Sequence, residues 1–235
     1  MSFATSVVNT TIKGITRIIC RVEDEQLERV PSGGPLILVT NHVNFLEVPL
    51  LYTHLLPRPI TGFAKVETWD NPAMAYLFNL WQAIPIRRGE PDRKALRLGL
   101  KALRDGKILA IAPEGTRSGH GRLGRGRGGV AMMALLSGAP LLPVVYYGGE
   151  ILSRNLTHLQ RTEFNIVVGN QFYLRAGEGK VDHFVRQEMA DEIMYQLAAL
   201  LPIYYRGNYS DLLNASETYL YFPPGSQSNI KNSVI

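Results

Sequence analysis

The sequence predicts a single α/β domain with a central, largely parallel mixed β-sheet flanked by helices. Short apolar runs alternate with helical patterns along the chain, which is typical of this fold class. The length of 235 residues suits one domain, and 46% hydrophobic with 19% charged residues allows a large core. Three polar clusters directly follow apolar runs. Because ligands of α/β sheets gather at the carboxyl ends of strands, these clusters are the candidate site.

The predicted strands are short apolar runs of the kind that parallel sheets bury on both faces. The first reads P-L-I-L-V-T over residues 35–40. Strands are predicted over residues 35–40, 61–65, 83–86, 107–112, 141–147 and 164–168. Since helical patterns lie between most of them, a parallel arrangement with helices on the sheet faces is expected.

Residues 93–105 have the clearest helical pattern. Leucines recur on one face with lysine and arginine elsewhere, Asp92 is a suitable N-cap, and Gly106 a suitable stop. Further helices are predicted over residues 130–136 and 184–200. The apolar stretch 71–86 is shorter than a membrane span, so it is expected to be a buried or interfacial helix.

The N-terminal residues 6–22 predict an amphipathic helix. Its apolar positions recur near helical spacing: Val7, Val8, Ile12, Ile15, Ile18 and Ile19. Lys13, Arg17 and Arg21 lie between them. Such a helix can lie in a layer of lipid headgroups, or it can pack on the protein's own core, and the pattern favours neither. We therefore divide the chain into this N-terminal helix (1–22), a central domain (23–222) and a flexible, polar tail (223–235).

Composition restricts the partners and the compartment. The net charge of +5 favours phosphate-bearing substrates, an anionic membrane surface or nucleic acid without distinguishing them. Cys20 is the only cysteine, so a disulfide framework is excluded and a reducing compartment is favoured.

No signal peptide is expected in residues 1–10. Residues 130–149 are uncharged and long enough to span a bilayer, but Pro140 and Pro143 favour a helix, a turn and a strand.

His42 and Glu47 form the first candidate pair, in the cluster N-H-V-N-F-L-E that follows the strand 35–40. Five residues is the wrong spacing for one helical face. However, Pro49 is tolerated only in a helix's first turn, so a helix should begin near residues 46–48 and bring Glu47 back towards His42. A carboxylate on one ring nitrogen leaves the other free as a base. Alternatively, Glu47 only caps the helix, and the spacing by itself favours that interpretation.

The second candidate cluster is P-E-G-T-R-S, which follows the strand 107–112. Gly115 permits a tight turn, and the planar guanidinium of Arg117 suits phosphate oxygens. Arg122, Arg125 and Arg127 follow on a glycine-rich frame. This segment lacks the aromatic residues that stack on single-stranded nucleic acid, and the chain has no P-loop motif. A third, basic cluster covers residues 87–92.

Four blocks of sequence occur in a recognisable order. They are N-H-V-N-F-L-E at 41–47, F-A-K-V-E-T-W with I-P-I-R-R-G at 63–69 and 84–89, A-P-E-G-T-R-S at 112–118, and L-L-P-V-V at 141–145. Together they resemble the bacterial 1-acylglycerol-3-phosphate acyltransferases, also called PlsC-type or glycerolipid acyltransferases. The likeness covers roughly residues 17–148. Glu47 departs from the family's N-H-x4-D pattern, which has Asp at that position. The joint match favours a catalytic role for His42.

The resemblance implies acyl transfer without a covalent acyl-enzyme. His42 would deprotonate the acceptor hydroxyl, which attacks the thioester of acyl-CoA or acyl carrier protein, while Glu47 holds the imidazole. The implied substrate-binding residues are Lys65, Arg88, Glu114, Gly115, Thr116 and Arg117. Of these, the three cations would bind the acceptor phosphate. Donors to the developing oxyanion are expected among backbone amides near Gly115.

The implied acceptor is 1-acylglycerol 3-phosphate or a related lysophospholipid, in phospholipid biosynthesis. The thioester is a co-substrate, and neither a cofactor nor a metal ion is expected. An anionic membrane surface is an expected partner and nucleic acid is not, with the protein peripheral or monotopic on the cytoplasmic side. Three alternatives stay open: a membrane-lipid-binding domain silenced by Glu47, a glycerol-3-phosphate acyltransferase, and a nucleic-acid binder using residues 117–127.

Overall fold

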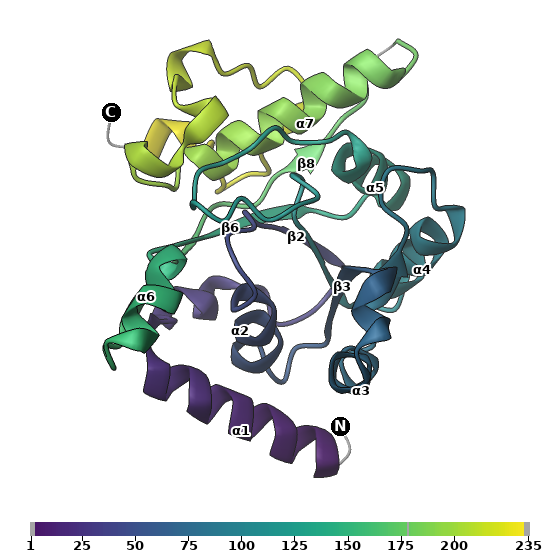
Figure 1. Cartoon of the computed structure of the whole chain (residues 1–235). Coiled ribbons are helices and arrows are strands. Elements are labelled where there is room, and N and C mark those ends of the chain that lie inside the picture. Colours follow the sequence, from purple (N-terminus) through teal and green to yellow (C-terminus); the bar gives the residue numbers. More distant parts are fainter. Residues whose placement is uncertain (1–2, 178, 233–235) are drawn as a thin grey trace.

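A seven-stranded sheet forms the centre of the computed structural model, which describes residues 3–177 and 179–232 (Figure 1). Its order is β1-β7-β6-β2-β5-β3-β4. The strands are β1 (Cys20–Glu23), β2 (Leu36–Val39), β3 (Ile60–Lys65), β4 (Ile84–Ile86), β5 (Ile108–Ile111), β6 (Leu141–Tyr147) and β7 (Thr162–Val168). Strands β6, β2, β5, β3 and β4 run parallel, and β7 is antiparallel to β6. The predicted fold class is confirmed.

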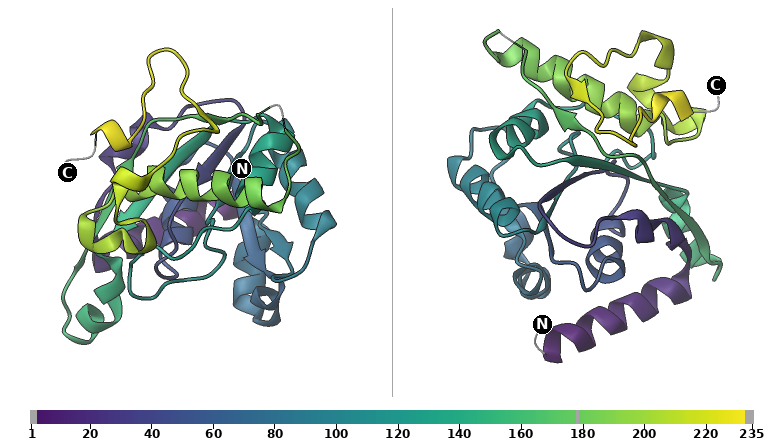
Figure 2. Two further views of the ribbon diagram at one scale, coloured as in Figure 1. Left: turned by 90° about the horizontal axis from the view of Figure 1, so that it is seen from above. Right: turned by 180° about the vertical axis from the view of Figure 1, so that it is seen from behind.

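Helices cover both faces of this sheet, as the two further views show (Figure 2). They are α1 (Phe3–Ile19), α2 (Glu47–His54), α3 (Pro72–Leu80), α4 (Arg93–Arg104), α5 (Gly129–Ser137), α6 (Leu152–Thr157) and α7 (His183–Ala198). One core cluster joins the sheet to α4, α5 and α7, and a second joins the opposite face to α1 and α2. A small antiparallel pair, β8 (Tyr173–Leu174) and β9 (Leu220–Tyr221), lies outside the main sheet.

Helix α4 shows how the sequence determines local structure. The Asp92 carboxylate accepts from the amides of Lys94 (3.1 Å) and Ala95 (2.9 Å), which satisfies two of the free amides at the helix start. Gly99 lies where the helix approaches its neighbours: a Cβ there would be 2.9 Å from both Phe63 and Met133 side-chain atoms. A larger residue would therefore push α4 away from the sheet.

The parallel strands end at one common edge, and the predicted polar clusters lie along it. The loop that contains His42 follows β2, the segment 112–128 follows β5, and the basic residues 87–92 follow β4. In the left view of Figure 2, α6 and the region of α3 extend past the sheet on the same side as the segment after β5. The carboxyl edge of the sheet thus lies between two projecting regions, α6 at one end and α3 at the other.

The N-terminal boundary predicted at residue 22 lies inside a strand. Helix α1 ends at Ile19, and Cys20–Glu23 pairs in parallel with β7 as the edge strand β1. One face of α1 packs on the protein's own core, and the other face is exposed. Ile12 and Ile19 pack on the core, whereas Ile15 and Ile18 are 52% and 72% exposed.

The stretch 71–86 does not form one continuous helix, and its helical part is not buried, so the prediction was wrong in its length and in its buried alternative. Helix α3 ends at Leu80, Gln82 adopts a positive φ of 54°, and β4 begins at Ile84. None of the nine residues of α3 is buried. The reversal at Gln82 turns the chain back into the sheet, which a continuous helix cannot do.

The polar segment 223–232 packs against the domain instead of forming the expected loose tail. Ser228 and Asn229 are each 2% exposed. The Asn229 side-chain oxygen accepts from the Asn170 amide (2.7 Å), and the Asn229 amide donates to Gln196 Oε1 (2.9 Å). These hydrogen bonds give polar residues a buried place. Residues 233–235 of the predicted tail lie outside the described residues.

Among residues 3–177 and 179–232, no helix has the length and apolar character needed to cross a bilayer.

Candidate active site

His42 and Glu47 meet at the carboxyl end of β2. The distance from His42 Nδ1 to Glu47 Oε2 is 2.7 Å, and the side chains are 15% and 3% exposed. Glu47 is the first residue of α2, as the position of Pro49 predicted. Nε2 of His42 makes no hydrogen bond with any described residue. The ring is therefore fixed at one nitrogen and available for proton transfer at the other.

The second oxygen of Glu47 explains how a longer side chain serves in place of Asp. Oε1 accepts from the backbone amides of Val43 (2.8 Å) and Asn44 (2.7 Å). The loop between His42 and α2 thus folds around the carboxylate. The extra methylene is accommodated without loss of the contact to the imidazole, because the loop amides hold the carboxylate in place.

Asn41 fixes the start of this loop, a role that the sequence argument missed. Its side chain continues the sheet: Nδ2 donates to the Tyr146 carbonyl (2.7 Å), and Oδ1 accepts from the Tyr146 amide (2.8 Å). Asn41 is 1% exposed. The amide side chain therefore imitates a backbone partner of β6 at the point where His42 must leave the sheet. The only sequence signal for it was its place between the strand and His42.

Glu114 joins the two principal clusters. Its carboxylate accepts from the His42 amide (3.0 Å) through Oε1 and from the Gly124 amide (2.8 Å) through Oε2. Burial raises the pKa of Glu114, and the hydrogen bonds from Gly124 and His42 oppose that shift. Glu114 was predicted as a substrate-binding residue that shapes a turn. In the structure its carboxylate contacts backbone amides of the His42 loop and of the glycine-rich segment.

The segment 115–119 is held by backbone hydrogen bonds to the loop of His42. Ser118 donates to the His42 carbonyl (2.8 Å), Gly119 donates to the Val43 carbonyl (3.1 Å), and Gly115 donates to Ala112 (3.0 Å). Gly115 has φ +70°, as a tight turn requires. Its amide is thus already used, whereas the amides of Thr116 and Arg117 have no partner among the described residues.

The three cations predicted to bind phosphate lie along the same edge of the sheet. Lys65 ends β3, Arg88 follows β4, and Arg117 follows β5. All three are exposed, and their side chains make no ion pair or hydrogen bond with the described part of the chain. Thr116 is also exposed. The structure places these residues at the predicted edge without bringing them into contact with His42.

The glycine-rich segment after the site is held by the C-terminal region, which no short motif indicated. Leu123 is 2% exposed, its amide donates to the Tyr205 carbonyl (2.9 Å), and its carbonyl accepts from the Asn208 amide (3.1 Å). The Arg122 guanidinium lies 4.3 Å from the centre of the Tyr204 ring. The signal in the sequence was Leu123, an apolar residue within a glycine and arginine frame.

Residues 21–147 match the model of the family described as Acyltransferase. The 1-acyl-sn-glycerol-3-phosphate acyltransferase of Bacillus subtilis is 30% identical over 122 residues, 52% of this chain and 60% of that protein. The lyso-ornithine lipid O-acyltransferase of Pseudomonas aeruginosa is 32% identical over 111 residues, 47% of this chain and 42% of that protein. The chain thus spans about half the length of the curated relatives it matches.

A solved structure resembles the fold. The crystal structure of the 1-acyl-sn-glycerophosphate (LPA) acyltransferase PlsC from Thermotoga maritima aligns with a TM-score of 0.59 and 21% identity. The alignment covers 81% of this chain and 78% of that one. At this identity the likeness concerns the arrangement of helices and strands.

Proposed function

The chain belongs to the acyltransferase family of the PlsC type, and on that premise we propose that it transfers a fatty acyl group from a thioester to the hydroxyl of 1-acylglycerol 3-phosphate or a related lysophospholipid. The observation that carries the proposal is the 2.7 Å contact between His42 Nδ1 and Glu47 Oε2 at the carboxyl edge of the sheet. It leaves Nε2 as the candidate base, in a loop at the edge where α/β sheets bind ligands.

In the proposed reaction, His42 Nε2 takes the proton of the acceptor hydroxyl as the hydroxyl oxygen attacks the thioester carbonyl carbon. Glu47 Oε2 accepts a hydrogen bond from Nδ1–H throughout, remains ionised, and stabilises the imidazolium. The tetrahedral intermediate then collapses, the carbon–sulfur bond breaks, and the imidazolium returns its proton to the leaving thiolate. The products are an ester and a free thiol, and the protein ends in its starting protonation state.

Charge stabilisation in the proposed reaction comes from two sources at the same edge. Lys65, Arg88 and Arg117, which have no ion pair among the described residues, supply cations for the acceptor phosphate. The free amides of Thr116 and Arg117 are the candidates for the oxyanion, in place of the Gly115 amide, which already donates to Ala112. Thr116 and Arg117 lie next to the loop of His42, because Ser118 donates to the His42 carbonyl. Lys65 and Arg88 follow β3 and β4, farther along the same edge.

Catalysis is favoured over a silenced lipid-binding domain by the setting of Glu47. Its carboxylate is 3% exposed and lies 2.7 Å from the imidazole, so the longer side chain still reaches the ring that it would orient. Its two oxygens divide between the ring and the loop amides, as in an orienting residue of a catalytic pair.

Attachment to a membrane is a further part of the proposal, because an acyl-bearing acceptor is drawn from a bilayer. The exposed side of α1 carries Val7, Ile15 and Ile18, which are 48%, 52% and 72% exposed. Arg17 and Arg21 lie near Asp24 (3.2 Å) and Glu163 (4.0 Å). Since two of the three cations have acidic partners, apolar insertion contributes more to attachment than charge does.

A thiol-release assay with the full chain tests the proposal. Acyl-CoA and acyl carrier protein are each offered with 1-acylglycerol 3-phosphate, other lysophospholipids, lyso-ornithine lipid and glycerol 3-phosphate. We expect the fastest turnover with a phosphate-bearing lysophospholipid, since the three cations at the edge of the sheet can bind its phosphate. Turnover with glycerol 3-phosphate alone would assign the alternative enzyme activity. No turnover with any pair, combined with binding to vesicles, would assign the silenced domain.

A further inference from the structure

Helix α4 carries a row of cations that the proposed reaction does not use. Its solvent side presents Lys94, Arg97, Lys101 and Arg104, all exposed and spaced three or four residues apart. Residues at this spacing lie on one face of a helix. The opposite side, with Ala95, Gly99, Ala102 and Leu103, is buried against the sheet and α5. We call the four exposed cations the α4 basic row.

The net positive charge of the whole protein arises from the sequence region that contains this row. Residues 87–107 contain eight lysines and arginines and three aspartates and glutamates, a net charge of +5. The remaining chain therefore has seventeen of each sign and is neutral. Asp92 is engaged with the amides of Arg87, Lys94 and Ala95, and Asp105 pairs with Lys101 at 2.6 Å. Lys94, Arg97 and Arg104 have no ion pair among the described residues.

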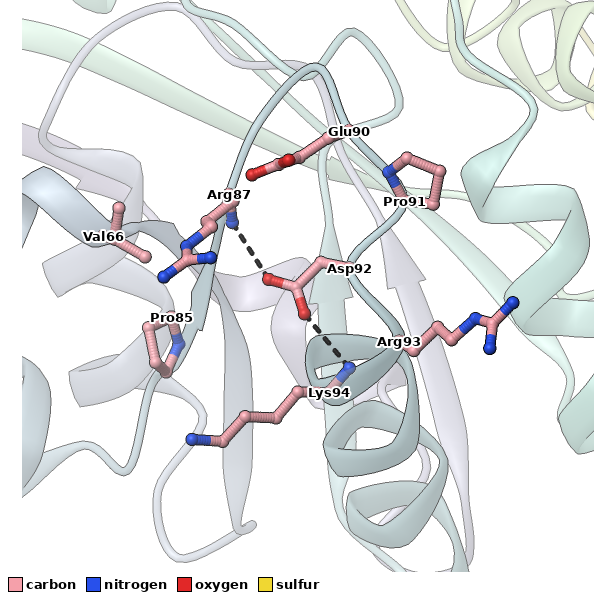
Figure 3. A pocket seen from close by; sticks show the side chains of 8 residues that line it. All are labelled: Val66, Pro85, Arg87, Glu90, Pro91, Asp92, Arg93 and Lys94. Atoms are coloured by element: carbon pink, nitrogen blue, oxygen red, sulfur yellow. Dashed lines mark hydrogen bonds between the residues drawn. The ribbon is translucent and has the colours of Figure 1, made fainter.

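The row begins at a pocket beside the site and leads away from it. The pocket measures about 420 Å³ and is lined by Val66, Pro85, Arg87, Glu90, Pro91, Asp92, Arg93 and Lys94 (Figure 3). In Figure 3 the side chains of Arg87 and Lys94 lie on the same side of Asp92. From Lys94 to Arg104 the helix rises about 15 Å at 1.5 Å per residue. The row therefore extends well beyond the space that a few phosphate groups occupy.

Exposed apolar side chains lie on α4 and on the adjacent helix α5. Leu98 of α4 is 38% exposed, and Met132 and Leu136 of the adjacent α5 are 36% and 58% exposed. Exposed apolar residues bordered by charged residues are typical of surfaces that bind another protein. The opposite signs of the two partners would then set orientation and speed of encounter.

We propose that the α4 basic row, with Leu98, Met132 and Leu136, is the docking surface for an acidic protein, namely the acyl carrier protein that presents the thioester. The proposal rests on the proposed function for the identity of this partner. His42 follows β2 and the pocket lies beside β4, three strands apart in the order β2-β5-β3-β4. At about 4.8 Å per strand the separation is about 14 Å, so the thioester must arrive on a long flexible arm.

A bilayer fits this surface less well than a protein does. Helix α1, with its exposed isoleucines, packs on the opposite face of the sheet from α4 and α5. A membrane that lies against the exposed side of α1 is thus on the other face of the sheet from the α4 basic row. Nor does the nucleotide of CoA fit, because its phosphates would reach only one end of a row about 15 Å long.

The test compares two double variants with equal net charge. Arg97→Glu with Arg104→Glu reverses the far part of the row, away from the pocket. Lys180→Glu with Lys231→Glu makes the same charge change at exposed positions elsewhere. Binding of fluorescently labelled holo-acyl carrier protein to the full chain is measured by anisotropy at low and moderate salt. The Michaelis constants are measured for acyl carrier protein and for acyl-CoA of the same chain length. Circular dichroism checks the fold, and an Arg97→Gln, Arg104→Gln variant serves if the reversal disturbs it.

We expect the α4 variant to weaken carrier binding about tenfold or more, in a salt-dependent manner, and the control to bind like the wild type. The Michaelis constant for the acylated carrier should rise similarly, while that for acyl-CoA stays within about twofold. Unchanged carrier binding, or equal losses with both donors, would overturn the proposal. So would loss of anionic-vesicle binding by the α4 variant without any effect on the carrier. If no donor supports transfer, the proposed function fails, and the binding measurement still decides whether α4 is the docking surface.

Discussion

At the scale of single residues, the candidate site consists of one imidazole and the groups that hold it in place. Glu47 orients the ring, Asn41 fixes where the loop leaves the sheet, and Glu114 holds the His42 amide. Pro49 limits where the helix can begin and so made the His42 and Glu47 pair possible, and the joint match of the four sequence blocks favoured it over a helix cap. It did not predict the contacts of Asn41 and Glu114, since their partners are backbone groups 105 and 72 residues away.

Glu47→Gln should lower turnover by about a hundredfold, which is less than the loss caused by His42→Ala. The base survives in the Glu47 variant, but its orientation is damaged. Glu47→Asp should retain more activity than Glu47→Gln, since it keeps the negative charge. Initial rates at saturating substrate give the comparison, with melting temperatures to monitor the loop. Equal and negligible effects of Glu47→Gln and His42→Ala would support the silenced domain instead.

Arg117→Ala should raise the Michaelis constant for the acceptor by about tenfold or more and leave that for the acyl donor unchanged. A guanidinium that binds the acceptor phosphate belongs to one substrate only. Steady-state kinetics with each substrate varied in turn measure this. Comparable weakening of both substrates would show that Arg117 supports the loop.

His54 gives a dependence of stability on pH that is independent of catalysis. Burial lowers its pKa from about 6.5 to about 4, helped by Lys13 and opposed by Asp24. The unfolded chain therefore binds the proton more tightly, and the stabilising effect of the neutral ring is complete above pH 6.5 and lost as the pH falls towards 4. The loss should be about 3 kcal/mol. The free energy of unfolding, measured with urea between pH 7 and pH 4, should depend less steeply on pH for His54→Gln than for the wild type. An equal dependence on pH in both proteins would contradict the assignment.

At the scale of secondary structure, the sequence predicted elements well where one physical signal dominated. Strand β6 spans residues 141–147 as predicted, and α4 begins at Arg93 after the Asp92 cap. The predictions failed where distant partners decide. Strand β1 is four residues long and depends on β7, and the reversal at Gln82 depends on the sheet that receives β4. Neither dependence is visible in a local pattern.

Helix α1 carries the prediction at this scale. Ile15→Glu with Ile18→Glu should reduce flotation with anionic vesicles severalfold, because both side chains are exposed and apolar. Phe184→Glu with Leu213→Glu makes the same change at exposed apolar positions on the α7 side of the molecule. Deleting residues 1–22 is a poor test, since it also removes most of β1 from the sheet. Flotation that is unaffected by the α1 variant would exclude α1 as the anchor.

At the scale of the whole molecule, the sheet separates the three regions to which we assign proposed tasks. The carboxyl edge holds the candidate site, α1 lies on one face, and the α4 basic row lies on the other. Four sequence blocks indicated the edge, because each follows or forms a parallel strand. The separation of α1 from α4 could not be predicted, since it depends on which face each connection crosses. The C-terminal region that holds Leu123 likewise has no local signature.

Formation of diacylglycerol 3-phosphate from 1-acylglycerol 3-phosphate and a radiolabelled acyl thioester tests the central claim most directly. Wild type and His42→Ala are compared at equal concentration, after equal melting temperatures establish that both are folded. The account predicts labelled product from the wild type and a rate about a thousandfold or more lower from His42→Ala, because the general base is lost. No product from the wild type, or more than a few per cent of its rate from His42→Ala, would contradict the claim.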